Sequence, residues 1–227
     1  YGPNAVNKVR EGVKYATELG MYVIIDWHIL NDGNPNQHKS EAKKFFTKMS
    51  KKYGGQKNVI YEICNEPNGN VTWNKQIKPY AKTIVKTIRK HSKNAVIVIG
   101  TPTWSQDVDV VAQSPLKGKN LMYALHFYAG THKEWNQEKL KTAHKKGLPV
   151  MVTEFSICDA SGNGALDKAS GNQWLRLLDR YNISYTAWSL CNKNESSALI
   201  ASTCSKTSGW TNGDLSAAGK WDFNKTK

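Results

Sequence analysis

Two glutamates, Glu66 and Glu154, stand at the ends of apolar stretches that have the composition of buried β-strands. The first closes "NVIYEICNE" and is followed at once by a proline, and the second closes "LPVMVTE". A protonated carboxyl and an ionised one on the two sides of an acetal can break it, because one releases the leaving oxygen and the other attacks the anomeric carbon. The pair therefore predicts acid-base and nucleophilic chemistry on a glycosidic bond, if both strands end at the same place.

Most of the other apolar runs also end in residues that do chemistry or bind polar ligands. They are Asp26, Trp27, His28, Asn65, Trp104, His126, Tyr128 and Trp188. A (β/α)8 barrel gathers the carboxyl ends of its parallel strands around one mouth, where its active site lies, whereas an open sheet scatters them. The first strand-to-helix turns also lack a glycine-rich phosphate loop, which weakens the alternative of a dinucleotide-binding sheet. A barrel is therefore the expected architecture.

The elements that must position these residues repeat along the chain as strand, helix and loops. Short β-rich runs recur about every 25 to 38 residues, the length of one βα unit. They occupy residues 21–26, 58–64, 95–100, 121–127, 148–155 and 183–190. Helix-like amphipathic patterns occupy 5–20, 41–55, 73–93 and 163–182, and 101–115 holds a short helix at best. Runs that are apolar on both faces predict a parallel sheet covered by helices, in a single domain over residues 1–227.

The charge of the chain is strongly positive, +14, from 32 lysines and arginines against 18 acidic residues. A nucleic-acid partner is one explanation of such a charge. The lysines, however, are spread along helix-like stretches, and no stripe combines them with stacking aromatics. Solvated helix faces explain them better, so no nucleic-acid partner is expected. No apolar run approaches the roughly 18 residues of a membrane span, and no charged-then-apolar leader opens the sequence, so no membrane association is expected either.

The four cysteines, Cys64, Cys158, Cys191 and Cys204, have no spacing typical of a metal site. Cys191 and Cys204 could bridge a loop in an oxidising compartment, and reduced, partly buried thiols fit equally well. Cysteine usage therefore leaves the compartment open. Carboxylate chemistry on an acetal needs no metal, and we expect neither a metal nor another cofactor.

Six motifs together resemble a known family. "IYEICNEPNG" and "PVMVTEFS" are similar to the acid/base and nucleophile strands of glycoside hydrolase family 5. "VIIDWHIL", "GTPTWSQDV", "ALHFYAGTH" and "AWSLCNKNESSALI" resemble its bacterial endo-β-1,4-glucanases (cellulases) of the Bacillus and clostridial type. The resemblance spans nearly the whole chain, in the order of the family. It implies an α/β TIM (β/α)8-barrel glycosidase that is incomplete and N-terminally truncated, with about six βα units corresponding to the third to eighth strands of the family.

The resemblance also implies roles for individual residues. Glu66 would be the general acid/base, and Glu154 the nucleophile that forms a glycosyl-enzyme ester. Asn65 would bond the 2-hydroxyl of the sugar at the cleavage site. Tyr128 would bond the nucleophile, and His126 would support the acid/base. No metal ligand is implied.

Further substrate-binding residues are implied on both sides of the scissile bond. His28 would bind sugar hydroxyls beside the nucleophile, and Trp188 would stack under the sugar on the non-reducing side. The remaining four would lie further from the cleavage point, with Lys193 and Glu195 on the non-reducing side and Trp104 and His132 on the leaving-group side.

Each of these roles has a plainer alternative. Either glutamate alone could be a loop carboxylate or a helix-capping partner. His126 could be a core histidine with its hydrogen bonds satisfied, and Trp188 could be core filler, although the apolar face of a sugar stacks well on tryptophan. Lys193 and Glu195 could form an ordinary surface ion pair.

The expected activity is that of a retaining endo-β-1,4-glucanase acting on cellulose, β-glucan or cello-oligosaccharides. A mannanase or xylanase of the same family is the nearest alternative. A second class is a catalytically weak or silent fragment that binds β-glucan through Trp104 and Trp188. We expect a secreted protein, and we expect the two open edges of an incomplete barrel, beside 21–26 and 183–190, to favour self-association.

Overall fold

The computed structural model describes residues 4–225. It contains two compact units, and the boundary between Ala124 and Leu125 falls inside strand β4 (Leu121–Tyr128). Each unit is described by itself below. The expectation of a single domain over the whole chain stays a prediction.

The first unit is built on parallel strands that alternate with helices, as the sequence predicts. β1 pairs with β2, β2 with β3, and β3 with the beginning of β4, all in parallel register. β3 is buried at every position, as expected of a strand with both faces covered. The other strands of this unit are β1 (Val23–Asp26), β2 (Val59–Glu62) and β3 (Ile97–Ile99).

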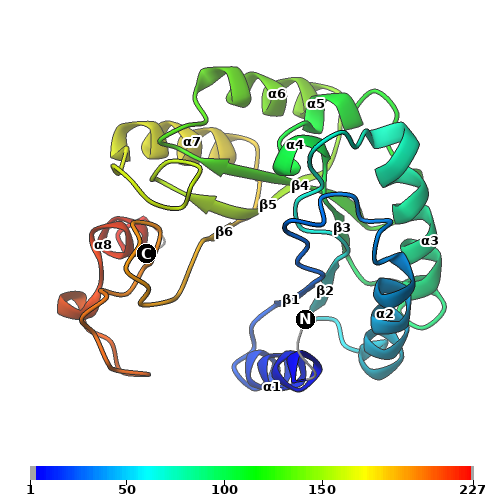
Figure 1. The fold of residues 1–227 in the computed structure, drawn as a ribbon, viewed down its shortest axis with the longest axis horizontal. Helices are drawn as coiled ribbons and strands as arrows, with labels where there is room; N and C mark the ends of the chain where they lie inside the picture. The colour runs from blue at the N-terminus through cyan, green and yellow to red at the C-terminus, as the bar shows by residue number, and fades with distance from the viewer. Residues whose placement is uncertain (1–3, 226–227) are drawn as a thin grey trace. The chain divides into compact units, whose positions relative to one another are not determined.

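Helices follow the strands of this unit in the chain, as Figure 1 shows. α2 packs against α3, and both helices present an apolar stripe inward: Phe46, Met49, Ile84 and Ile88 are fully buried. The predicted helix at 73–93 begins instead with a π-helical turn, where the hydroxyl of Thr72 accepts the N–H of Lys75. The helices of the unit are α1 (Ala5–Glu18), α2 (Lys39–Tyr53), η1 (Trp73–Ile77), α3 (Lys78–Arg89), α4 (Pro102–Ser105) and α5 (Val108–Val111).

The second unit holds the end of β4 and two further strands around an aromatic core. β5 and β6 pair in parallel, with an irregularity between Val152 and Phe155. The ring of Phe127 stacks on that of Trp174, with centroids 4.0 Å apart, and on that of Phe155 at 5.2 Å. The elements are β5 (Val150–Ser156), β6 (Tyr185–Ala187), α6 (Glu134–Lys145), α7 (Lys168–Arg180), η2 (Asn212–Asp214) and α8 (Ala217–Phe223). η2 and α8 were not expected from the sequence.

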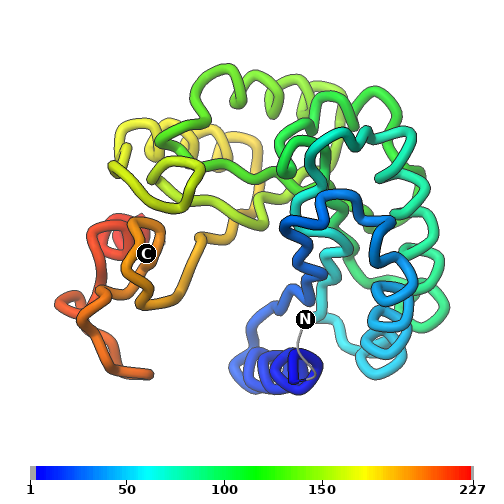
Figure 2. Tube along the Cα trace, in the orientation of Figure 1, coloured from blue at the N-terminus to red at the C-terminus, as the bar shows by residue number. Residues whose placement is uncertain are grey.

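Hydrogen bonding orders the strands β1-β2-β3-β4-β5-β6, so that sequence neighbours are also sheet neighbours. The trace in Figure 2 shows the chain leaving each strand through a helical segment before the next strand begins. Within residues 4–225, β1 pairs only with β2 and β6 only with β5. Next to β1, Met21 and Tyr22 expose 56% and 74% of their surface. The edges needed for self-association are therefore present, and the association itself stays a prediction. No helix in the described part of the chain is long and apolar enough to cross a bilayer.

Candidate active site

Glu66 follows β2 on a backbone that is held from both neighbouring strands. The N–H of Ile63 donates to the carbonyl of Val98 in β3, at 3.0 Å, and the N–H of Asn65 donates to the carbonyl of Trp27 after β1, at 3.1 Å. Gly100 lets the chain approach closely, because a Cβ there would lie 2.2 Å from the carbonyl oxygen of Cys64. These contacts fix the position of the backbone segment that precedes Glu66.

A left-handed turn holds the same segment from the side of β3. Thr103, Trp104 and Ser105 have φ angles of 56°, 54° and 56°, a region that non-glycine residues occupy only where the surroundings impose it. The hydroxyl of Ser105 donates to the carbonyl of Asn65 at 2.7 Å, and the N–H of Trp104 donates to the carbonyl of Pro67 at 3.0 Å. The turn leaves 48% of Trp104 exposed, which a sugar-stacking side chain requires.

His28 and Asn65 lie together on the first unit. His28 Nδ1 is 2.7 Å from Oδ2 of Asp26, and His28 Nε2 is 3.5 Å from the side-chain nitrogen of Asn65. The Asn65 amide also donates to the carbonyl of Ile29 at 3.1 Å. With its Nδ1–H donated to Asp26, the imidazole presents Nε2 as an acceptor. Asp26 was noted at a strand end, but its role as the partner that orients His28 was not predicted.

Glu154 lies in β5 and is 7% exposed. The phenol of Tyr128 donates to its Oε1 at 2.6 Å, and Nδ1 of His126 is 3.9 Å from its Oε2. The other ring nitrogen of His126 is 2.9 Å from the hydroxyl of Thr153, a partner that the sequence did not suggest. The structure thus brings Tyr128 and His126 to the predicted nucleophile, while support of Glu66 by His126 stays a prediction.

His132 and Trp188 are joined to this group through the backbone. His132 Nδ1 accepts the N–H of Tyr128 at 2.8 Å, and its carbonyl accepts the indole N–H of Trp174, also at 2.8 Å. The N–H of Trp188 donates to the carbonyl of Phe155, the residue after Glu154, at 2.8 Å. The peptide bond between Trp188 and Ser189 is cis.

Lys193 and Glu195 form a loose pair. Lys193 Nζ is 3.9 Å from a carboxylate oxygen of Glu195, and the two side chains are 67% and 27% exposed. Such an exposed pair contributes little to stability, so both groups stay available to a polar ligand.

Outside these groups, the surroundings of Asp167 and of Cys64 shift the pKa values of their side chains. The ammonium of Lys133 holds the pKa of the Asp167 carboxyl below its usual value, helped by the N–H of Ser170, which Asp167 caps at the start of α7. Complete burial raises the pKa of the Cys64 thiol. All four cysteines are free thiols in this structure.

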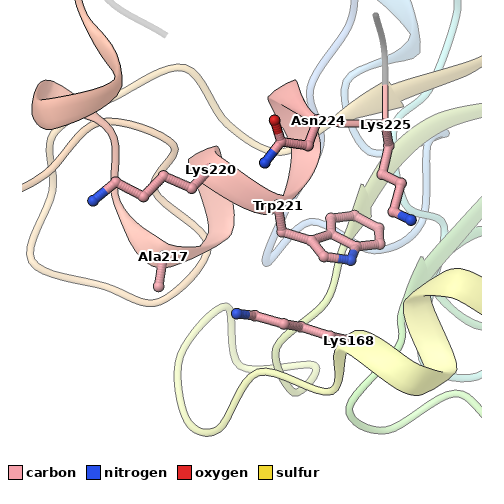
Figure 3. Close-up of a pocket in the computed structure, with 6 residues that line it drawn as sticks. All are labelled: Lys168, Ala217, Lys220, Trp221, Asn224 and Lys225. Carbon is pink, nitrogen blue, oxygen red and sulfur yellow. The ribbon is translucent and has the colours of Figure 1, made fainter.

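The described residues of each unit form hollows at its surface. In the first unit a mainly apolar hollow of about 560 Å³ includes Asp26, Trp27 and His28 in its lining. The second unit has a hollow of about 490 Å³. Figure 3 shows its lining, with Lys168 from the start of α7 and Trp221 from α8. Its further lining is Ala217, Lys220, Asn224 and Lys225. Its lysine-rich lining contains no predicted site residue.

The predicted site residues therefore fall into two groups. His28, Asn65, Glu66 and Trp104 belong to the first unit, and His126, Tyr128, His132, Glu154, Trp188, Lys193 and Glu195 to the second. The contacts described above join the members of the first group, and those of the second except Lys193 and Glu195, which are paired with each other. The approach of Glu66 to Glu154 stays a prediction.

Curated proteins similar to this chain are bacterial endoglucanases. An endoglucanase of Clostridium saccharobutylicum is 50% identical over 93% of this chain and 47% of its own length. Endoglucanase 5 of Pectobacterium carotovorum subsp. carotovorum is 47% identical over 96% of this chain and 43% of its own length. The chain therefore spans about half the length of these relatives.

Solved structures, cellulases among them, share the fold. A structure from Cytophaga hutchinsonii superposes with a TM-score of 0.93 and 40% identity, covering 97% of this chain and 71% of that one. The catalytic domain of Thermobifida fusca endoglucanase Cel5A, in complex with cellotetraose, superposes with a TM-score of 0.92 and 34% identity. The match covers 97% of this chain and 74% of that one. These matches and the six-stranded order confirm the predicted fold class, an incomplete (β/α)8 barrel. The family model for cellulase (glycosyl hydrolase family 5) matches residues 1–194, and the chain belongs to that family.

Proposed function

We propose that this chain carries the catalytic carboxyls of a retaining endo-β-1,4-glucanase that cuts cellulose, β-glucan and cello-oligosaccharides. The observation that carries the proposal is the buried carboxylate of Glu154, held by the phenol of Tyr128 at 2.6 Å in a chain of the cellulase family. A carboxylate fixed in one orientation by a short hydrogen bond is prepared for in-line attack, because it does not have to reorganise during the reaction.

The reaction has two balanced steps. In the first, a Glu154 oxygen attacks the anomeric carbon while the glycosidic C–O bond breaks and the proton of Glu66 moves to the leaving oxygen. In the second, water attacks the same carbon, gives its proton to Glu66 and releases Glu154 as a carboxylate. Retention requires the two carboxyls to lie about 5 to 5.5 Å apart. Their positions after β2 and within β5 support this pairing, because parallel strands in a barrel share one carboxyl edge.

The substrate class rests on the groups around each carboxyl. His28 and Asn65 offer polar atoms for sugar hydroxyls, and the exposed indole of Trp104 offers a face for a pyranose. The cellotetraose bound to Thermobifida fusca Cel5A supports a β-1,4-glucan as the ligand. Because such a polymer is too large to enter a cell, we also propose that the protein acts outside it.

The test combines loss and rescue of activity. Glu66→Ala and Glu154→Gly should each lower the hydrolysis of carboxymethyl cellulose by at least about a hundredfold. With an aryl β-cellobioside, added azide should rescue Glu66→Ala to a β-glycosyl azide and Glu154→Gly to the α-anomer, because azide replaces water in one variant and the nucleophile in the other.

The matched control is Glu134→Gln, an exposed glutamate in the first turn of α6, which should retain the parent rate. Equal sugar release by the parent and Glu154→Gly would remove Glu154 as nucleophile. Binding of cello-oligosaccharides without any release by the parent would make the chain a binding fragment. Release of sugar from mannan or xylan but not from cellulose would show that the substrate is one of those polymers and not a β-1,4-glucan.

A further inference from the structure

Trp135 is an exposed aromatic side chain in the first turn of α6. Half of its surface (50%) is accessible to solvent. Single exposed apolar residues are common on protein surfaces and need no function. Its neighbours, however, distinguish this tryptophan from an ordinary surface residue.

The indole is held by charged and aromatic groups. The ring of His132 meets it edge-on, with centroids 5.8 Å apart and planes at 74°. The ammonium of Lys139, one helical turn further along α6, lies 5.1 Å from the ring centroid. These contacts limit the freedom of the side chain before any ligand binds, so that less conformational entropy is lost on binding.

Direct contacts connect Trp135 with the predicted nucleophile. Tyr128 donates its phenol to Glu154 and its backbone N–H to His132 Nδ1, and the ring of His132 touches Trp135. All four residues lie in the second unit. Three contacts therefore connect the exposed indole with the carboxylate that would attack the sugar.

We propose that Trp135 is a stacking platform for a glucose unit of the leaving-group part of the glucan, beyond the sugar next to the scissile bond. The inference rests on the proposed function and on the predicted role of His132 on that side. A tryptophan presents a broad apolar face to the C–H face of a pyranose and loses little side-chain freedom on binding. Trp135 thus gives the enzyme a preference for long chains.

The experiment compares a substrate long enough to reach Trp135 with a substrate that is too short to do so. 4-Nitrophenyl β-cellobioside ends in a single aromatic ring after the scissile bond, whereas cellohexaose continues through further sugars. Trp135→Ala should lower kcat/KM for cellohexaose about five- to tenfold and leave kcat/KM for the cellobioside unchanged. Trp135→Tyr should recover most of the loss, because it restores an aromatic face.

Trp210 provides the matched control. It is also exposed (39%), but its indole N–H donates to the carbonyl of Lys206 in the 201–211 loop. Trp210→Ala should leave kcat/KM unchanged for both substrates. An unchanged cellohexaose rate in Trp135→Ala, or an equal loss on both substrates, would overturn the platform. Thermal unfolding of each variant separates a misfolded Trp135→Ala from a specific effect, and Trp135→Leu, which keeps apolar volume without an aromatic face, then takes its place.

Calorimetric binding separates this inference from the proposed function. If the parent binds cellohexaose but hydrolyses nothing, the proposed catalysis fails, and the platform is supported only if Trp135→Ala weakens that binding. If the parent hydrolyses both substrates and Trp135→Ala matches it, only the platform fails. If the parent binds no cello-oligosaccharide, both fail.

Discussion

The phenol of Tyr128, the last residue of β4, donates a 2.6 Å hydrogen bond to Oε1 of Glu154 in β5. Both side chains are buried, with 8% and 7% of their surface exposed. In such surroundings the bond fixes one oxygen of the carboxylate and leaves the other for chemistry. Hydrogen bonds to charged groups are worth about 1.5 to 3 kcal/mol.

Replacing Tyr128 with phenylalanine should therefore impair catalysis more than folding. Tyr128→Phe keeps the ring but removes the donor to Glu154, and kcat/KM on cello-oligosaccharides should fall by about 10- to 150-fold. Steady-state kinetics measures the change. The matched control is Tyr123→Phe in the same strand, where the hydroxyl donates instead to the carbonyl of Leu116. It should cost about 1 kcal/mol of unfolding free energy and leave kcat/KM intact; the reverse pattern would contradict the role of Tyr128.

The close approach at Gly100 predicts a large loss of stability on substitution. In Gly100→Ala the new Cβ would lie 2.2 Å from the carbonyl oxygen of Cys64 and 2.9 Å from Cδ of Pro67. The clash involves backbone that cannot move without displacing the segment before Glu66, so the free energy of unfolding should fall by about 2 to 4 kcal/mol in urea titrations.

Gly12→Ala is the control for this change. Gly12 lies inside α1, and a Cβ there meets no atom within 4 Å. Alanine should therefore stabilise the helix by about 0.5 to 1 kcal/mol. Equal effects of the two substitutions would show that Gly100 is not a point of close approach.

The cysteines should differ in reactivity. Cys64 is fully buried and burial raises the pKa of its thiol, so little thiolate forms, whereas Cys191 is partly exposed. In a titration with Ellman's reagent, Cys191 should react first and Cys64 only after unfolding. Cys191→Ser should remove the fast phase; its persistence would contradict this order. A parent with two thiols fewer than the sequence contains would instead reveal the Cys191–Cys204 disulfide.

The strand positions could be predicted because each strand is a local pattern. Runs such as "VIIDW" and "VIVIG" are apolar on both faces, and the structure places β1 and β3 within them. Compared with the predicted runs 21–26 and 95–100, both strands begin two residues later, and β3 ends one residue earlier. A two-sided apolar run can be buried only between layers of helices. The order of the sheet followed from the repeat of strand and helix.

The turn at Thr103, Trp104 and Ser105 could not be predicted, because none of these residue types favours a positive φ. Hydrogen bonds to Asn65 and Pro67, distant in sequence, impose it. The same holds for Asp26 and Thr153: their polar side chains are visible in the sequence, but the histidines that they orient are identified only by the fold. The approach of Glu66 to Glu154 depends on closure across many residues, and no local pattern encodes it.

The ion pair at the start of α7 predicts a pH dependence of stability. Lys133 Nζ lies 2.5 Å from Oδ2 of Asp167, whose Oδ1 accepts the N–H of Ser170 at 2.9 Å. These contacts hold the pKa of Asp167 below its ordinary 3.8. The unfolded chain therefore binds a proton at Asp167 at a higher pH than the folded chain does. The stabilisation is complete above about pH 5 and is lost as the pH falls through the ordinary pKa and then the lowered one.

Asp167→Asn tests this dependence, since asparagine keeps the capping acceptor but removes the charge. Both partners are partly exposed, 42% and 38%, so the loss at neutral pH should be below about 1 kcal/mol. In urea unfolding, the difference in unfolding free energy between the parent and Asp167→Asn should become smaller as the pH falls from about 5 to about 3. Lys133→Met also removes the hydrogen bond from Nζ to the carbonyl of Ala129, so it should cost at least as much, and adding Asp167→Asn to it should cost little more. If that difference does not depend on pH, or if the double variant loses the sum of the free energies lost by the two single variants, the two charges are not coupled.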